Sequence, residues 1–427
     1  MLLQSLLRPV LTPLMRGMFD APIASSTEWS PLDLWPDGID SPGMWISPRD
    51  LTSQWQDSAG TTPVATPGTV ADSANPVGWA LDIRAGATVL TDPGNHMLQS
   101  TAVDRPLLSA RVNLLVQTEN LANAAWFSTV SGSTITTGVS DPLGGTTAFT
   151  ITANTTNGQA YQNLGSITIP RIASGYIRRR TGTGVVKFYA DGGAAGTDIT
   201  SQVTASWTPF SVASSTNYGS WYVLLQTAGD AIDVWHPQVE SGLVSTQYQR
   251  VGAASDYDAT GITPFQIYDG TDDGMATASF AAGTLTSSMD CLIAVRRDSA
   301  ANAVCGLYES VAEANKVFGI AESGSGSGCA GSGAGTPTVW VDNVQLTGGT
   351  AVTRDTLHTA LTAGAFHILE FRGLDLSTWT ASGFGLYTSY KLPGARGDIM
   401  LYPSTASTTD KDAARQYLAD LYGVTLP

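Results

Sequence analysis

The chain has 427 residues with 36 acidic and 21 basic side chains, and its formal net charge is −15. A field of that sign repels a phosphate backbone, so the charge argues against nucleic-acid binding. Charged residues are only 13% of the chain, with 45 glycines, which is typical of many short strands joined by small-residue turns. A hydrophobic fraction of 42% is ample for packed cores, and the length predicts roughly two to four domains.

Residues 1–30 form an apolar segment whose hydrophobic side chains recur about every four positions. This spacing places them along one helical stripe, although Pro9 and Pro13 predict a kink. Arg8 and Arg16 interrupt the apolar run, so no bilayer span is predicted. We expect an N-terminal anchor that packs either within the chain or against a partner or symmetry mate. The anchor residues are Leu3, Leu6, Leu7, Leu11, Leu14 and Phe19.

Residues 31–110 are rich in Trp, Pro and Gly and show little sustained periodicity. We interpret this stretch as a loop-rich connector. Its four large aromatic residues can pin the loops to neighbouring surfaces or stack on carbohydrate, and pinning is the favoured interpretation. They are Trp35, Trp45, Trp55 and Trp79.

Residues 111–255 read as β structure throughout. An apolar run at 112–116 opens this domain, and an alternating stretch at 231–250 closes it. Between them, short β-type runs are separated by Gly, Thr and Asn, the pattern of a sandwich. Strands are predicted at 146–153, 160–169, 175–179, 184–190, 207–213 and 220–225.

Residues 256–427 continue with strands and end in a helix. Thr408 or Thr409 is the predicted N-cap, and Gly423 is the predicted stop. One face of this helix is apolar because of Ala414, Tyr417, Leu418, Leu421 and Tyr422. Further strands are predicted at 291–296, 338–341, 367–371, 384–389 and 397–402.

Several segments resemble one family of proteins when taken in order. The delimiters 111–126 (RVNLLVQTENLANAAW) and 231–250 resemble the carbohydrate-binding-like jelly-roll of tailed-phage head-spike and tail-fibre proteins. Ahead of them, GMWISPRDL, WQDSAGTTP, PVGWALD and GNHMLQSTAVDRP occur in the order seen in such proteins. Residues 265–275 resemble the first strand and turn of concanavalin A-like, laminin G-like lectin domains, with Tyr268 ahead of Asp269–Gly270.

The resemblance implies a mainly β fold with two consecutive antiparallel β-sandwich (jelly-roll) domains. A short helical anchor (1–30) and a connector (31–110) would precede the jelly-roll (111–255) and the lectin-like sandwich (256–427). The chain would be a structural protein of a tailed-phage particle, assembled in the host cytoplasm and bound to capsid, portal-vertex or tail components. A homotrimer is expected because fibres and spikes of this kind are usually trimeric. Many copies per particle would give avidity for host-surface polysaccharide.

Candidate ligand-binding residues follow from the same resemblance. Aromatic faces and polar loop groups are what sugar recognition uses, and the candidates are Trp126, Trp235, Tyr268, Asp272 and Asp273. Asp269, Asp272 and Asp273 are also weak candidates for Ca²⁺, weighed against an ordinary Asp/Gly turn. No other cofactor is expected.

The chemistry of the chain favours a protein that is not an enzyme. Histidine is scarce (His96, His236, His358 and His367) and shows no metal-binding spacing. A purely structural decoration or connector protein is the alternative, and a capsule-degrading enzyme is a weaker one, since two carboxylates suffice for glycoside hydrolysis.

Two smaller features carry expectations of their own. The basic run at 178–180 is interpreted as a solvated strand end or ion-pair site rather than a polyanion site. Cys291 and Cys305 are expected to be buried, whereas Cys329 lies in a Gly/Ser run where its thiol is expected to be exposed.

Overall fold

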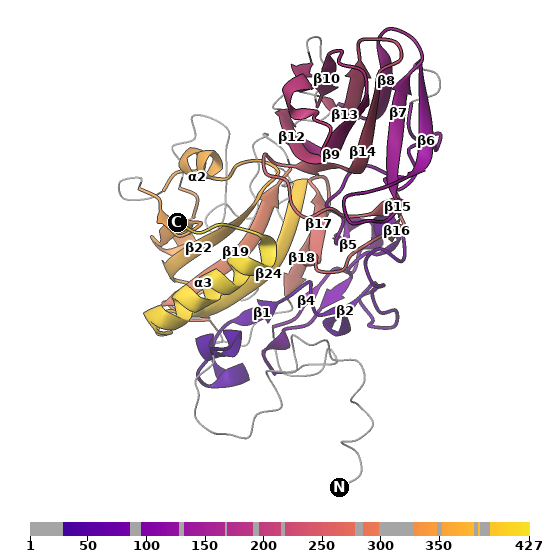
Figure 1. Cartoon of the computed structure of the whole chain (residues 1–427). Helices are drawn as coiled ribbons and strands as arrows, with labels where there is room; N and C mark the ends of the chain where they lie inside the picture. Colours follow the sequence, from indigo (N-terminus) through magenta and orange to yellow (C-terminus); the bar gives the residue numbers. More distant parts are fainter. Residues whose placement is uncertain are drawn as a thin grey trace, which may run out of the picture.

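The protein is mainly β, with antiparallel sheets arranged as two sandwiches (Figure 1), which confirms the predicted fold class. It is known from a computed structural model. The structure describes residues 29–85, 95–127, 132–166, 169–190, 196–214, 218–277, 285–298, 328–330, 332–347, 352–379, 383–384 and 393–427. Residues 1–28 of the predicted N-terminal anchor, including all of its named apolar residues, therefore lie outside the described residues, as do Cys305 and most of the strand predicted at 384–389.

The larger sandwich, which we call the host sandwich, consists of an eight-stranded and a five-stranded sheet. The first sheet has the order β21 (Val344–Gln345), β20 (Thr338–Val341), β22 (Phe366–Leu374), β19 (Met289–Arg297), β24 (Pro393–Pro403), β17 (Phe265–Asp269) and β5 (Leu107–Ser109), with β1 (Met44–Ile46) also beside β24. The second has the order β2 (Gln54–Trp55), β3 (Trp79–Ala80), β4 (Met97–Leu98), β18 (Met275–Thr277) and β23 (Gly383–Phe384).

This pairing differs from the predicted domain order. Strands β1 to β5 all come from the stretch interpreted as a separate connector, yet they complete both sheets of the C-terminal sandwich. For example, Met44 is opposite Leu401 of β24, and Ala276 of β18 is opposite Leu98. Residues 31–110 and 256–427 are therefore one folding unit, because neither stretch supplies a complete sheet.

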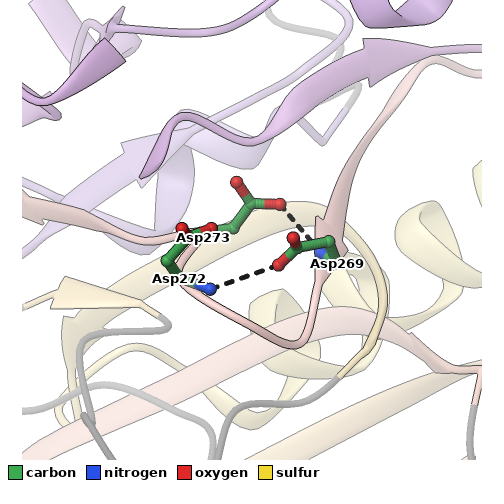
Figure 2. A group of neighbouring side chains, drawn as sticks. All are labelled: Asp269, Asp272 and Asp273. Atoms are coloured by element: carbon green, nitrogen blue, oxygen red, sulfur yellow. Dashed lines mark hydrogen bonds between the residues drawn. The ribbon is translucent and has the colours of Figure 1, made fainter. Parts of the chain in front are cut away.

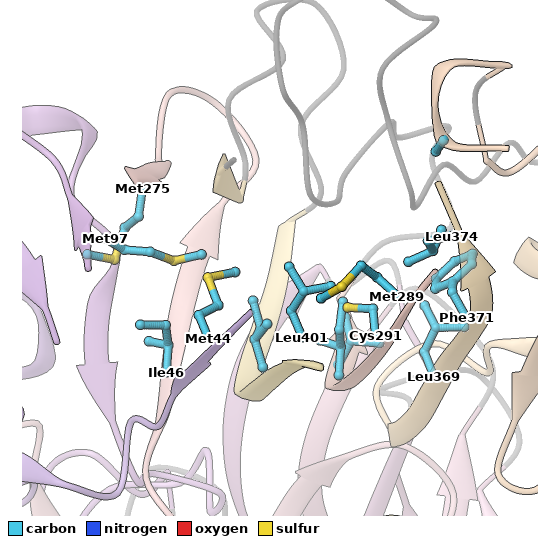
Figure 3. Close-up of a cluster of buried hydrophobic side chains, with 14 of the residues drawn as sticks. Met44, Ile46, Met97, Met275, Met289, Cys291, Leu369, Phe371, Leu374 and Leu401 are labelled. Atoms are coloured by element: carbon cyan, nitrogen blue, oxygen red, sulfur yellow. The ribbon is translucent and has the colours of Figure 1, made fainter. Parts of the chain in front are cut away.

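The core of the host sandwich shows the same union (Figure 3). Met44, Ile46 and Met97 from the N-terminal stretch lie in one buried cluster with Met275 and Leu401 from the C-terminal stretch. Burying apolar surface is the main favourable term in folding. The two stretches consequently share their principal source of stability.

A second apolar layer covers the outer face of the eight-stranded sheet. Helix α3 (Thr408–Tyr422) lies across this face (Figure 1), and the short helix η1 (Pro31–Leu34) packs beside it. Trp35 is buried here, and its Nε1 donates to the carbonyl of Leu401 at 3.1 Å. Trp45 and Trp79 are also buried, so pinning is the role of these tryptophans.

Helix α3 ends as predicted but begins one residue earlier. Gly423 closes the helix in the left-handed region at φ 68°, where glycine is favoured. The N-cap is Ser407, whose hydroxyl accepts from the backbone N–H of Asp410. The predicted cap at Thr408 or Thr409 was wrong, because the sequence offers three consecutive capping residues and only the hydrogen bond distinguishes them. A second helix, α2 (Arg354–Ala360), was not predicted from the sequence.

The second sandwich, which we call the insert, is built entirely from the middle of the chain. Its four-stranded sheet has the order β11 (Thr197–Asp198), β10 (Val186–Tyr189), β13 (Tyr218–Leu225) and β8 (Gly158–Ser166). Its five-stranded sheet has the order β12 (Thr208–Ser214), β9 (Arg171–Thr181), β14 (Ala231–Ser241), β7 (Ala148–Ala153) and β6 (Ser133–Val139). Strands β7, β8, β9, β10, β12 and β13 match the six predicted for this domain, and β14 matches the predicted alternating stretch at 231–250, whereas β6 and β11 were not predicted.

The insert leaves and re-enters the host through two paired strands. Ser109 of β5 lies opposite Phe265 of β17, so the chain departs and returns at adjacent points of one sheet. The short pair β15 (Val251–Ala253) and β16 (Asp256–Tyr257) lies at this junction (Figure 1). The middle domain is thus inserted into the host sandwich rather than placed ahead of it.

Candidate functional site

The outer face of the four-stranded sheet of the insert carries a continuous row of aromatic rings. Tyr189 lies opposite Tyr222, Tyr222 lies opposite Tyr161, and Phe127 bridges to Tyr161 at the sheet edge. We call Phe127, Tyr161, Tyr222 and Tyr189 the tyrosine row. The centroids of successive rings are 5.0, 5.1 and 4.6 Å apart, which is about the spacing of neighbouring strands.

Strand alternation explains why these rings face outward. In β13, Trp221 and Val223 point into the core of the insert and are fully buried, whereas the intervening Tyr222 is only half-buried. Successive side chains of a strand point to opposite faces. The same alternation places Phe188 in the core and Tyr189 outside.

The rings of the tyrosine row stand on edge. Interplanar angles of 13°, 39° and 21° at these short centroid distances mean that the rings face one another. One end is closed, because a Cβ on Gly196 would lie 2.5 Å from Cζ of Tyr189. Phe127, 44% exposed, occupies the other end. The row therefore presents ring edges and hydroxyls rather than open ring faces.

The hydroxyl group of Tyr222, in the middle of the row, remains protonated near neutral pH. The Tyr222 hydroxyl donates to Oε1 of Gln159. Burial, with smaller contributions from Tyr189 and Tyr161, raises the pKa of Tyr222 above its usual value. The row can therefore both donate and accept hydrogen bonds along one line.

The aromatic residues predicted as ligand contacts are not available to a ligand. Trp126 is 3% exposed and packs edge-on against Trp221, with its Nε1 bonded to the carbonyl of Gln117. Trp235 is 6% exposed and lies between Tyr176 and His236. The prediction was wrong for both residues. Trp126 is part of the core of the insert, and Trp235 is part of a small apolar cluster on the outer face of its five-stranded sheet.

Tyr268 also belongs to the core. It is 4% exposed, its hydroxyl bonds to Oε1 of Gln266 at 3.1 Å, and burial raises its pKa to about 12. The resemblance placed this residue correctly at the end of β17 but assigned it the wrong role. Tyr268 packs the host sandwich.

The three aspartates proposed for Ca²⁺ lie together in the turn between β17 and β18 (Figure 2). Their carboxylate oxygens are within 4.8 Å of one another. Asp269 Oδ1 accepts from the backbone N–H of Thr271 at 2.6 Å and of Asp272 at 3.3 Å, and Asp273 Oδ2 accepts from the N–H of Asp269 at 2.7 Å. These bonds are those of a tight Asp/Gly turn, and the same three carboxylates lie close enough together to hold a cation.

The basic run at 178–180 forms ion pairs. Arg178 and Arg180 both contact Asp233, at 2.7 and 2.6 Å, and Arg179 contacts Asp230 at 3.4 Å. This confirms the ion-pair interpretation. The three arginines lie on β9, and their acidic partners are Asp233 on β14 and Asp230, the residue that precedes β14.

The two described cysteines are both buried. Cys291 was expected in the core, and burial raises the pKa of its thiol above its usual value. The expected exposure of Cys329 was wrong: its side chain is 1% exposed and lies in the core of the host sandwich. A Gly/Ser run says nothing about which of its residues packs inward.

His236 forms a compact stack at a bulge in β14. Its ring centroid is 3.4 Å from that of Trp235 and 3.7 Å from that of Tyr248, and its φ is 54°. Burial lowers the pKa of His236 to about 4, against a smaller opposite effect of Asp141. The stack therefore contains the neutral imidazole.

This lowered pKa predicts an acid-sensitive insert. The folded state binds fewer protons than the unfolded state between pH 6.5 and about 4, so the stabilisation by His236 is complete above pH 6.5 and is lost as the pH falls through that window. We expect the thermal midpoint of the insert to fall more steeply across this window in the wild type than in His236→Asn. Asn tolerates positive φ. Identical pH profiles by calorimetry would contradict the expectation.

Fold and site together define a mainly β protein with one sandwich inserted into another and an aromatic row on the inserted one. Along the described ranges, none of the helices has the length and apolar character needed to cross a membrane. No protein-family model and no curated protein matches the chain.

One solved structure with some similarity is the N-terminal CBM22-1–CBM22-2 tandem domain of Xyn10C from Paenibacillus barcinonensis. The match has 13% identity, covers 70% of this chain and 94% of that one, and has a TM-score of 0.24. A superposition of that quality carries no argument about this protein. The function proposed below is therefore argued from the residues of this chain.

Proposed function

We propose that the protein is a non-enzymatic binding protein whose insert recognises an extended, neutral polysaccharide along the tyrosine row. The observation that carries the proposal is the unbroken register of Phe127, Tyr161, Tyr222 and Tyr189 across the sheet. Regularly spaced amphipathic side chains suit a polymer of repeating hydroxyl-rich units. Rings with an apolar body and a polar tip are favoured at binding surfaces of this kind.

The edge-on geometry makes a specific prediction about the hydroxyls. We expect Tyr161→Phe and Tyr189→Phe each to weaken binding of the full chain to neutral oligosaccharides about 2- to 10-fold, the value of one neutral hydrogen bond. Glycan-array screening would identify the oligosaccharide, and calorimetric titration would measure the change. Tyr176→Phe is the matched control, because Tyr176 lies on the opposite sheet. Equal affinities for all variants would exclude the row as the binding site.

The wider role that we propose is that of a structural component of a tailed-phage particle, a head spike or tail fibre. In this proposal residues 1–30 attach the chain to capsid, portal-vertex or tail proteins, and the insert projects toward host-surface glycans. A homotrimer and many copies per particle would turn weak single sites into avidity. The support is the ordered series of sequence segments and the departure and return of the insert at two paired strands of the host sandwich.

The test of that wider role is direct. Labelled antibody and electron microscopy should locate the chain on the surface of intact particles. Adsorption to host cells should then be compared between particles with the full-length protein and particles whose protein lacks the insert. Equal adsorption would show that the protein is only a structural connector. A fall in capsule viscosity on incubation with the purified protein would instead show an enzyme.

A further inference from the structure

A pair of arginines on the other face of the insert is arranged around one carboxylate. In the five-stranded sheet, Arg178 lies directly opposite Asp233, and a bulge at Ala231/Ile232 leaves Arg180 as an extra residue of β9. Bulges re-aim side chains and are common next to functional sites. Here the bulge brings both Arg178 and Arg180 to the same acidic side chain.

Asp233 holds the two guanidinium groups in place. Its side chain is 1% exposed; Oδ1 accepts from Arg180 Nε and from Thr150 Oγ1, each at 2.6 Å, and Oδ2 accepts from Arg178 Nε at 2.7 Å. Arg178 is also fixed by the Trp207 ring, 4.7 Å from the ring centroid to Cζ. Two cations around one anion leave one positive charge uncompensated at this point.

The outer edge of Arg180 is available to a ligand. Its side chain is 44% exposed, and among the described residues its hydrogen bonding to Asp233 uses only Nε. Both Nη atoms therefore keep their donors in a fork whose direction is set by the buried carboxylate. A planar fork of this kind matches a carboxylate in bidentate geometry.

The surroundings indicate what kind of carboxylate. The row that contains Arg178 and Asp233 continues through Thr150 to Thr136, which is exposed on β6. Thr150 is buried and donates to Asp233, so the exposed Thr136 is the hydroxyl residue on this side of the surplus charge, and the half-buried Trp207 lies on the other side. A single surplus charge suits a monoanionic group, and the net charge of −15 disfavours densely charged polyanions.

We propose that Arg178 and Arg180 form a binding site for the carboxylate of an acidic sugar, separate from the tyrosine row. The site lies on the outer face of the sheet β12-β9-β14-β7-β6, whereas the row lies on the opposite sheet. The insert would thus take neutral units on one face and a uronate-type unit on the other. This site does not depend on whether the tyrosine row binds.

The test uses the full chain and two matched probes, a galacturonate trisaccharide and the corresponding neutral galactose trisaccharide, measured by titration calorimetry. Arg180→Gln should weaken binding of the galacturonate probe about tenfold or more, since a hydrogen bond to a charged group is lost. Binding of the neutral probe should not change. Arg250→Gln is the control, because Arg250 forms an exposed pair with Asp256 elsewhere on the chain.

Three results would overturn the proposal. One is galacturonate binding that is the same in the wild type and in Arg180→Gln. Another is an equal loss in Arg250→Gln, which would indicate a general charge effect. The third is displacement of galacturonate by inorganic phosphate at equal concentration, which would indicate an unselective anion patch. Loss of neutral-sugar binding in the tyrosine-row variants affects none of these outcomes.

Discussion

Deleting residues 31–110 is expected to unfold the C-terminal half of the protein. The deletion removes β1 and β5 from the eight-stranded sheet and β2, β3 and β4 from the five-stranded sheet, which leaves only β18 and β23 of the latter. Two strands alone are marginally stable at best in water. Met44, Ile46 and Met97 also leave the core. Hydrogen exchange should show unprotected amides throughout residues 256–427 in the deleted chain.

Excision of the insert is the matched experiment. Because Ser109 and Phe265 are paired neighbours, joining them with a turn of about two to five residues gives an ordinary hairpin between β5 and β17. The excised chain should keep one cooperative thermal transition, and the isolated insert should show its own. If residues 256–427 still contain protected amides in the chain that lacks residues 31–110, they fold without that stretch, and the predicted order of separate domains is correct.

The insert was well predicted because its signals are local. Its strands are long enough for alternation to be read, as in Trp221–Tyr222–Val223, where only the middle residue faces outward. The longer C-terminal strands of the host sandwich were predicted as well, since 291–296, 338–341, 367–371 and 397–402 match β19, β20, β22 and β24. Its N-terminal strands were not, because β1 has three residues and β2, β3 and β4 have two each. So short a strand shows no period, and its partner can be more than 300 residues away, as for Met44 and Leu401.

The candidate site shows the same limit. Trp126 and Trp235 were predicted as aromatic faces for a sugar because of the resemblance, but both are buried, since the size of an indole ring favours burial as much as binding. The tyrosine row depends on the mutual register of four distant residues. Outward-facing tyrosines in alternating strands were the signal in the sequence that could have found it. The register itself follows from tertiary packing, which no local pattern contains.

The second large effect is expected at Glu370, a fully buried carboxylate between β22 and helix α3. Its Oε2 accepts from Arg415 Nε at 2.9 Å, and its Oε1 accepts from Arg372 Nε at 2.7 Å. The side chain of Arg415 is only 4% exposed. Glu370→Ala leaves this guanidinium buried without its main partner, and breaking a buried pair in this way costs about 3–5 kcal/mol.

We expect urea unfolding of the Glu370→Ala variant to show the loss in the transition of the host sandwich and not in that of the insert. The exposed pair between Arg250 and Asp256 is the control, and Asp256→Asn should leave the urea midpoint nearly unchanged, because solvent screens the pair. Replacing both members of the buried pair, as in Glu370→Met with Arg415→Leu, should recover much of the loss, because the buried guanidinium is then removed and only the partly exposed Arg372 loses its partner. If the double variant is no more stable than Glu370→Ala, the loss comes from packing against α3 rather than from the stranded charge.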